Sequence, residues 1–319
     1  MDTTAMLIDV AILTPIIAVV GILAFSKKPN LREAISLIAG VTLLAINLKL
    51  YSSFNHGEVL SRQWLEILPG LNLSFRVDAL GLLFGLVASL LWPVTTLYAI
   101  GYMRGHNEDH QTRFYACFAI AIAAVMAIAY AENLFTLFIF YEVLSLCTYP
   151  LVTHAGTEKA KKGGRVYLGI LMGTSIAFFL PAIIITWLVA GTLDFQQGGI
   201  FPEQTPIALL SLLLVLFVFG VAKAAVMPFH RWLPASLIAM RQDNLKARLA
   251  YSTISQLGYI TVGVLLAVES GVMGSAMHIA THALGKITLF FCAGAILVAS
   301  HKSEISSMVG LGRSMPITM

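Results

Sequence analysis

Three ionisable side chains recur at every fourth position of one apolar stretch. His278, His282 and Lys286 occur in MHIATHALGKITLFF. Residues spaced i, i+4 and i+8 lie on the same face of a helix. Imidazole titrates near neutral pH, and it can take up a proton on one nitrogen while releasing one from the other. The spacing therefore predicts that these three residues, called the polar row below, pass protons along a helix.

Two other interpretations of the polar row follow from the same residues. Two histidines at i and i+4 can bind zinc, but the segment offers no carboxylate or thiol that would complete a ligand set, so we expect no metal site. A purely structural polar stripe is the remaining alternative, and the spacing alone leaves it open.

A carboxylate is predicted to lie at membrane depth. Glu142 sits in LFTLFIFYEVLSLCTYPLV, about eight residues from the start of an apolar stretch. At 1.5 Å per residue it would lie roughly 12 Å into a hydrocarbon core about 30 Å thick. A charged group there costs several kcal/mol unless a partner or water compensates. Glu142 is therefore a candidate proton carrier, with a hydrogen bond that merely locks two helices as the alternative.

Two further lysines stand next to apolar stretches. Lys223 in LFVFGVAKAAVMPFHRWLP could exchange protons, because a buried lysine changes its protonation readily, or its ammonium could snorkel to the membrane interface. Lys246 in RQDNLKARLAYSTISQLGYI is a further functional candidate at the start of a helix, or it could simply anchor the helix end at the interface together with Arg248. The polar residues that follow could carry water toward the row: Ser252, Thr253, Ser255 and Gln256.

Composition predicts the elements that hold these residues. Of 319 residues, 58% are hydrophobic and 11% charged, whereas a soluble domain has about 25% charged residues. Apolar runs of about 20 residues, long enough to span a bilayer, recur along the chain. We predict an all-α polytopic transmembrane bundle of about nine helices, near 7–25, 34–51, 79–100, 114–130, 134–153, 166–190, 207–227, 249–268 and 272–299.

The distribution of lysines and arginines predicts which loops face the cytoplasm. Most of the 20 lysines and arginines fall in alternate loops, including the basic loops 26–33 and 154–165, which places those loops in the cytoplasm and the N-terminus outside. The longest outside loop, 52–78, alternates loosely in LNLSFRVD and is expected to form a short hairpin. The N-terminus has no basic leader, so the first apolar run is predicted to be a helix rather than a cleaved signal. We divide the chain into N-terminal helices 1–113 and a transport core 114–319.

Several classes of function lack their usual signals. The three cysteines, Cys117, Cys147 and Cys292, fall in predicted helices without a CxxC pair, and no GxGxxG stretch occurs. We therefore expect no cofactor and no redox catalysis by the chain alone. The net charge of +4 is accounted for by the loops and does not indicate a nucleic-acid partner.

Four stretches together resemble one family. LFIFYEVLSLCTYPLV, KAAVMPFHRWLPAS, QDNLKARLAYSTISQLGYI and MHIATHALGKITLFFCAGAI are similar to the proton-translocating antiporter-like proteins. These include the A and D subunits of Mrp-type cation/proton antiporters and the antiporter-like subunits of respiratory complex I and membrane-bound hydrogenases. Two stretches, GKITLFFCAGAI and AGTLDFQQGGI, most resemble the D type of Mrp subunit.

The resemblance implies roles for the candidate residues. Glu142 and Lys223 would form a charge pair whose closure and separation changes the proton affinity of the lysine. The polar row would carry protons along the middle of the membrane, and Lys246 would feed it. The sequence also departs from the family, since several tens of residues are absent after Ser236 and the chain stops at GLGRSMPITM. This predicts either a fragment with an internal deletion and a C-terminal truncation or a shortened relative of the family.

The expected function is proton translocation by one subunit of a multisubunit Na⁺ (monovalent cation)/H⁺ antiporter. A proton-pumping subunit of an NADH-quinone oxidoreductase or a membrane-bound hydrogenase is the alternative, and a non-conducting structural or remnant subunit is a second one. The expected partners are other subunits of such a complex, the lipid bilayer, protons and Na⁺. The expected location is the plasma or inner membrane, crossed several times.

Overall fold

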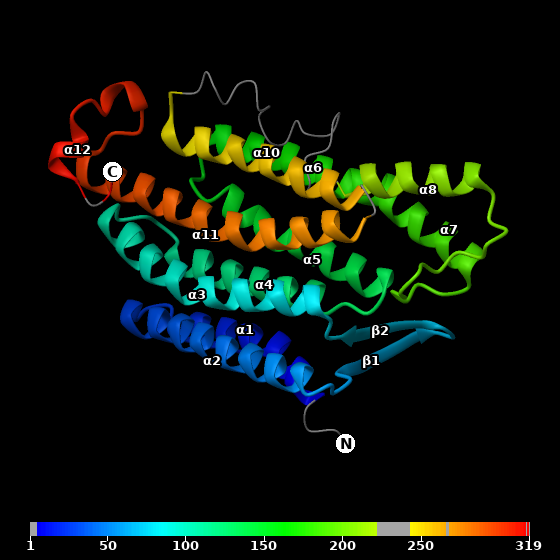
Figure 1. Cartoon of the computed structure of the whole chain (residues 1–319). Helices are drawn as coiled ribbons and strands as arrows, with labels where there is room; N and C mark the ends of the chain where they lie inside the picture. The colour runs from blue at the N-terminus through cyan, green and yellow to red at the C-terminus, as the bar shows by residue number, and fades with distance from the viewer. Residues whose placement is uncertain (1–4, 222–242, 266–267, 317, 319) are drawn as a thin grey trace. The chain divides into compact units, whose positions relative to one another are not determined.

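Helices dominate the computed structural model, which describes residues 5–221, 243–265, 268–316 and 318 (Figure 1). Within those ranges, seven helical spans are long and apolar enough to cross a membrane: α1–α5, the stretch Ala160–Ala190 and α11. The prediction of an all-α polytopic transmembrane protein is confirmed. The helices are α1 (Met6–Ala24), α2 (Pro29–Asn55), α3 (Ala79–Gly105), α4 (Gln111–Ala129), α5 (Leu134–Val152), α6 (Glu158–Thr174), α7 (Leu180–Ala190), α8 (Ile207–Gly220), α10 (Leu245–Leu265), α11 (Glu269–Ser300) and the short α12 (Leu311–Ser314).

Local sequence accounts for several helix ends. The side chain of Asn133 accepts a hydrogen bond of 2.7 Å from the Thr136 amide and so caps α5. Pro29 stands at the first position of α2, where its missing N–H is no loss. Gly191 ends α7 with a φ of 71°, a left-handed conformation that glycine adopts without strain. Each of the nine predicted spans contains a helix in its described part; in the span 207–227 this is α8, and residues 222–227 lie outside the described ranges.

The span predicted at 166–190 is not one regular helix. A π-helical segment, Ser175–Phe179, joins α6 to α7, and Pro181 stands in the first turn of α7. A proline has no N–H to donate to the carbonyl four residues earlier, so the regular hydrogen-bond pattern cannot run through this point. Pro150 lies inside the last turn of α5.

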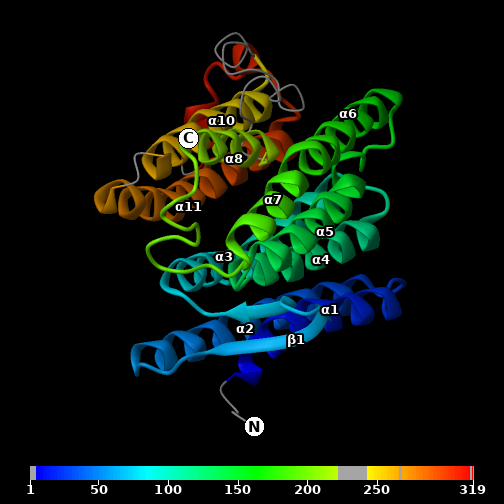
Figure 2. The ribbon, with the colours of Figure 1, turned by 90° about the vertical axis from the view of Figure 1, so that its right-hand side faces the viewer.

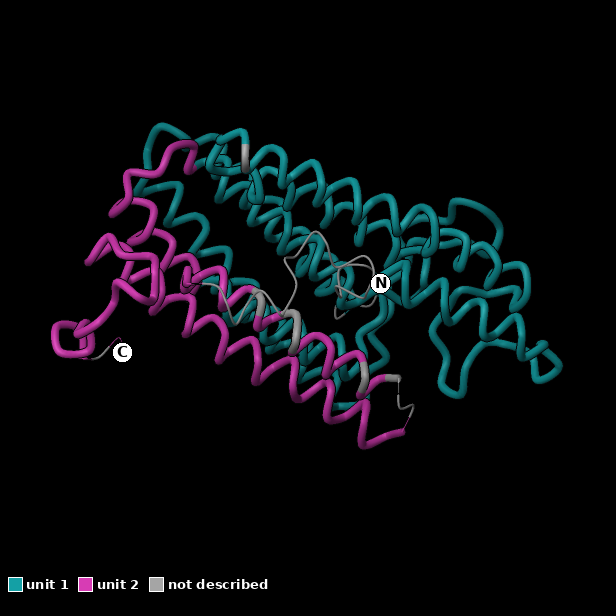
Figure 3. The backbone as a smooth tube through the Cα atoms, turned by 90° about the horizontal axis from the view of Figure 1, so that it is seen from above, with its two compact units in different colours: residues 1–93, 112–223 teal, residues 94–111, 224–319 magenta. Residues whose placement is uncertain are grey.

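The chain forms two compact units, which are shown in different colours in Figure 3. Unit 1 comprises residues 1–93 and 112–223, and unit 2 comprises 94–111 and 224–319. Helix α3 contributes its first part to unit 1 and its last turns to unit 2. The predicted division at residue 113 concerns function rather than compactness and stays a prediction.

The loop 52–78 contains the expected hairpin. Strands β1 (Ser61–Leu68) and β2 (Leu71–Arg76) are antiparallel, and Gly70 in their turn has a φ of 82° (Figure 2). Asp9 of α1 holds the hairpin, because its carboxylate accepts hydrogen bonds from Arg62 Nε at 2.9 Å and Trp64 Nε1 at 2.6 Å. The hairpin is thus tied to the first helix.

Polar contacts also join helices inside unit 1. The Tyr130 hydroxyl donates a hydrogen bond of 2.5 Å to Asn47 Oδ1, and Asn47 Nδ2 donates to the carbonyl of Gly85 at 3.3 Å. Asn47 belongs to α2, Gly85 to α3, and Tyr130 directly follows α4. Because Asn47 and Tyr130 are fully buried, these bonds remove the penalty of leaving polar groups unpaired.

One residue of the basic loop 26–33 is not solvated. Lys27 and Lys28 are exposed, whereas Arg32 lies within α2, which begins at Pro29, and its side chain is buried. Its guanidinium donates to Thr112 Oγ1 at 3.0 Å and lies 3.4 Å from the Glu33 carboxylate. A buried cation needs such partners. Arg32 therefore joins α2 to α4, in addition to any effect of its positive charge on the orientation of the chain in the membrane.

Candidate functional site

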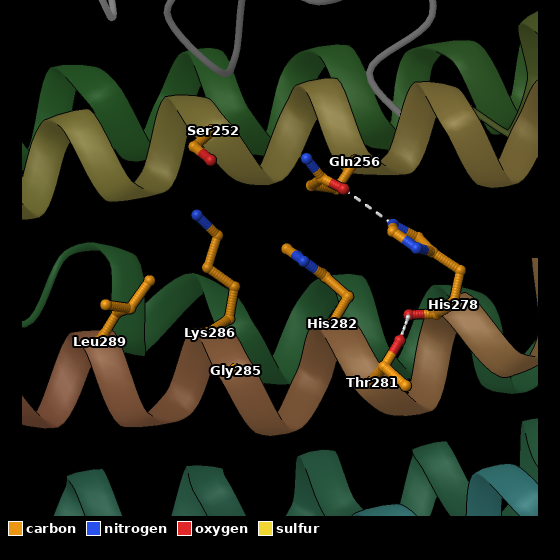
Figure 4. A pocket seen from close by; sticks show the side chains of 8 residues that line it. All are labelled: Ser252, Gln256, His278, Thr281, His282, Gly285, Lys286 and Leu289. Carbon is orange, nitrogen blue, oxygen red and sulfur yellow. Dashed lines mark hydrogen bonds between the residues drawn. The ribbon is translucent and has the colours of Figure 1, made fainter.

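Helices α10 and α11 of unit 2 hold the polar row between them (Figure 4). His278, His282 and Lys286 all project from α11 toward α10, as the i, i+4, i+8 spacing predicts. They line a pocket of about 370 Å³, whose other lining residues are Ser252, Gln256, Thr281, Gly285 and Leu289.

One end of the row is held by a hydrogen bond. His278 Nε2 lies 2.8 Å from Gln256 Oε1 of α10. A carboxamide oxygen only accepts, so His278 donates from Nε2, and in the neutral imidazole this leaves Nδ1 as the acceptor. The His278 and His282 rings are nearly parallel, with an interplanar angle of 11° and centroids 5.8 Å apart. The two rings are thus ordered as a stack.

The middle of the polar row has fewer hydrogen bonds than the end at His278. The buried Nε2 of His282 has no hydrogen-bond partner among the residues that the structure describes. Lys286 points toward the part of α10 that carries Ser252. A stripe that served only to join helices would be expected to have its polar atoms paired, since unpaired buried groups are destabilising. The arrangement leaves His282 Nε2 open to a hydrogen bond with water in the pocket.

The pocket is large enough for water. One water molecule takes up about 30 Å³ in the liquid, so a pocket of about 370 Å³ has room for several. His282 Nε2 is without a hydrogen-bond partner in the described ranges, and one intervening water could connect it to the neighbouring imidazole. The row can therefore pass a proton through water between neighbouring side chains.

Two of the expected water-carrying residues, Ser252 and Gln256, do line this pocket. The Thr253 hydroxyl instead donates to the Leu249 carbonyl of its own helix. The side chain of Ser255 lies outside the described part of the chain. In those ranges no three histidine, cysteine or acidic side chains come close enough together to hold a metal ion.

Lys246 does not line the pocket. It is the second residue of α10, and its ammonium donates a hydrogen bond of 2.9 Å to the Tyr102 hydroxyl. The same ammonium lies 4.2 Å from the centre of the Tyr102 ring. Asn244, just before the helix, accepts a hydrogen bond of 3.0 Å from the Ala247 amide and caps this helix end. Lys246 is thus held at the start of α10, facing α3.

A second row was missed by the sequence analysis. Tyr98, Tyr102 and His106 have the same i, i+4, i+8 spacing at the end of α3 as the polar row has on α11. Their rings stack in order, with centroids 5.9 Å apart for the tyrosines and 5.0 Å apart for Tyr102 and His106. The i, i+4, i+8 spacing is visible in the sequence, but a tyrosine in an apolar helix does not stand out as a titratable residue.

Glu142 lies in α5 of unit 1, and both carboxylate oxygens are buried. Neither oxygen has a hydrogen-bond partner within the described ranges. Its neighbour Tyr141 contacts Phe179 of the π-helical segment edge to face, with centroids 5.8 Å apart. Lys223 lies outside the described residues, so the predicted Glu142–Lys223 pair stays a prediction.

Comparisons with known proteins identify the family of this chain. The family described as "NADH:quinone oxidoreductase/Mrp antiporter, TM" matches residues 131–237 and 235–319. The "NADH-quinone oxidoreductase subunit N" of Desulforudis audaxviator is 25% identical over 70% of this chain and 56% of its own length. A probable K(+)/H(+) antiporter subunit of Rhizobium meliloti is 28% identical over 98% of this chain and 37% of its own length.

A solved structure shows the same fold. A chain of the membrane-bound sulfane sulfur reductase, an archaeal respiratory membrane complex, has a TM-score of 0.85 and 19% sequence identity, and the match covers all of this chain and 76% of that one. The chain spans about half the length of the curated relatives it matches. The alignment with the Rhizobium protein runs over 375 positions, more than the 319 residues present here, so that relative carries internal segments without a counterpart in this chain. On the evidence of the two matched stretches, which together cover more than half of the chain, this multi-pass membrane protein belongs to the NADH:quinone oxidoreductase/Mrp antiporter transmembrane family.

Proposed function

We propose that this chain translocates protons as one membrane component of a multisubunit monovalent cation/proton antiporter. The observation that carries the proposal is the pocket between α10 and α11, which is lined by two stacked imidazoles and a lysine. The Rhizobium relative, whose name describes part of a K(+)/H(+) antiporter, aligns with nearly the whole chain. Na⁺ or K⁺ as the exchanged cation, and the other subunits as partners, belong to the proposal.

The chemistry needs only proton transfer between adjacent groups. A proton that reaches the Lys286 amine forms the ammonium, which returns a proton to water in the pocket. His282 takes it on one nitrogen and releases one from the other, and His278 does the same. Gln256 orients His278 for this exchange through its hydrogen bond. Glu142, Lys223 and Lys246 are proposed to load and unload the row.

Lys286→Met tests the proposal, because methionine fills a similar volume without a proton-binding group. Proton transfer by a positioned side chain typically contributes at least about a hundredfold to a rate, so we expect proton flux to fall by about that factor. The measurement is the initial rate of pH change in sealed vesicles containing the full chain in its complex, with the amount of assembled chain determined in parallel. Lys162→Met, on the exposed side of α6, is the matched control and should keep its flux.

The proposal is wrong if Lys286→Met assembles normally and moves protons at the wild-type rate. A flux loss in the Lys162→Met control as well would point to a general effect of removing positive charge, and this too would contradict the assignment of Lys286.

A second candidate is a proton-pumping subunit of a redox complex. The Desulforudis relative, whose name describes part of an NADH-quinone oxidoreductase, is covered over more of its own length than the Rhizobium protein. In that case flux in vesicles would start on addition of an electron donor and would not respond to a cation gradient. In the antiporter a gradient of Na⁺ or K⁺ alone would drive it.

A further inference from the structure

Three helix ends meet at one end of unit 2. Gly105, the last residue of α3, lies against Val298 of α11 so closely that an added Cβ would be 3.0 Å from the valine side chain. Lys246 at the start of α10 is bonded to Tyr102 of α3. His301, directly after α11, has its ring 6.3 Å from the ring of His106. We call Tyr102, His106, Lys246 and His301 the helix-end cluster.

The cluster runs from an exposed to a more enclosed position. His301 is exposed, while His106, Tyr102 and Lys246 are half-buried. The His106 ring stacks on Tyr102 at 5.0 Å with an interplanar angle of 14°. His106 Nδ1 is buried, and no hydrogen bond to it is found in the part of the chain that the structure describes. A buried imidazole nitrogen without a bonding partner remains available for proton exchange.

Two acidic groups near the cluster are engaged in hydrogen bonds of their own. Glu304 lies 3.3 Å from Asn244 Nδ2, which donates to it, and Asp243 accepts hydrogen bonds from Ser306. The cation of the cluster, Lys246, is bonded to the Tyr102 hydroxyl. Among the described residues, the His106 ring stacks on the Tyr102 ring and lies 6.3 Å from the His301 ring, and the Lys246 ammonium lies over the other titratable ring, that of Tyr102.

We propose that His106 and His301 form a proton-exchange port through which the Lys246 amine reaches the aqueous phase at the helix ends. The inference rests on the proposed function and adds the route between Lys246 and water. Tyr102 acts as a positioning residue, because its hydroxyl holds the Lys246 nitrogen beside the port.

The step is a chain of proton transfers. A ring nitrogen of His301 binds a proton from hydronium, leaving water, and the resulting imidazolium releases a proton from its other nitrogen. Intervening water passes it to His106, and the neutral Lys246 amine finally binds it as ammonium. Because every step is reversible, the port serves uptake and release alike. Imidazole is suited to this since it titrates near neutral pH.

The test combines His106→Ala with His301→Gly in the full chain in its complex. Glycine suits position 301 because φ is 55° there, and both changes leave space for free imidazole. We expect proton flux at pH 8, where protons are scarce, to fall by on the order of tenfold or more, and added imidazole in the millimolar range to restore it. The matched control is His110→Gly, an exposed histidine of the same connection that also has a φ of 55°.

The outcomes separate the port from the proposed function. Flux that falls and is rescued by imidazole, with an unchanged control, supports the port. Wild-type flux in the double variant while Lys286→Met is inactive overturns the port and leaves the proposed function standing. Loss without rescue, in a correctly assembled complex, assigns the two histidines a structural role and also overturns the port. Full flux in Lys286→Met overturns the proposed function itself.

Discussion

At the scale of single residues, the Glu142 carboxylate is the least satisfied acid in the described part of unit 1. Its two oxygens are buried and accept no hydrogen bond there. We expect Glu142→Gln, which keeps the size but removes the ionisable group, to lower proton flux by about tenfold or more while the protein still assembles. The measurement is vesicle flux, and Glu158→Gln, on the exposed start of α6, is the control. A silent Glu142→Gln would favour the non-conducting alternative.

A second residue links stability to pH. The Ser306 side chain and amide donate hydrogen bonds to the Asp243 carboxylate, and these bonds hold the pKa of Asp243 below its usual value. Because the pKa of Asp243 is lower in the folded than in the unfolded state, where it is about 3.9, the ionised carboxylate stabilises the fold at pH values above 3.9. This contribution is lost as the pH falls through the lower folded-state pKa.

The corresponding comparison is Asp243→Ala against wild type by thermal denaturation from pH 7 to pH 3. The Tm difference should be present at neutral pH and shrink as the pH falls below the ordinary pKa of a carboxyl group. The exposed Asp109, changed to alanine, controls for the loss of any surface carboxylate. A Tm difference that stays constant down to pH 3 would contradict the role of the Ser306 bonds.

At the scale of elements, close approach of helices depends on particular glycines. An added Cβ at Gly85 of α3 would lie 2.5 Å from the Tyr130 hydroxyl, which is bonded to Asn47. We expect Gly85→Ala to lower stability by about 1–3 kcal/mol, because the helices must move apart or the hydrogen bond must break. Gly101 of the same helix has no described atom within 4 Å of its added Cβ, so Gly101→Ala should leave Tm equal or higher. Equal losses in both variants, measured in detergent, would refute the contact argument.

The sequence predicted the elements well where one physical signal dominates. Apolar runs longer than the bilayer core give the spans, and i, i+4, i+8 spacing placed the polar row on one face of α11. Prediction from the sequence failed where a tertiary contact decides the position or burial of a side chain. The burial of Arg32 depends on Thr112, 80 residues away, and the position of Lys246 depends on Tyr102 rather than on its own helix. Such partners cannot be inferred from spacing within a single helix.

At the scale of the whole molecule, the predicted topology can be tested directly. Three segments expected in the cytoplasm contribute to the helix-end cluster of unit 2: the connection after α3, the start of α10 and the residues after α11. Cysteines introduced one at a time at Glu58 and Glu158, both exposed, would report the sides. An impermeant thiol reagent should label position 58 from outside and position 158 only from inside, in a background without Cys117, Cys147 and Cys292. Labelling of both positions from one side would reject the topology.

The π-helical segment next to α5 changes the angular phase of the span that contains it. Each residue turns a helix by about 100°, so one extra residue between α6 and α7 rotates everything after it by that amount relative to an unbroken helix. In the resulting orientation, the Phe179 ring contacts Tyr141 of α5 and Phe217 of α8. Gly220 packs directly against the backbone of Phe179. Deleting a single residue there would turn one end of the span away from its neighbours while every hydropathy profile stayed the same. The surroundings of the residue next to Glu142 therefore depend on the number of residues in a neighbouring helix as much as on their identity.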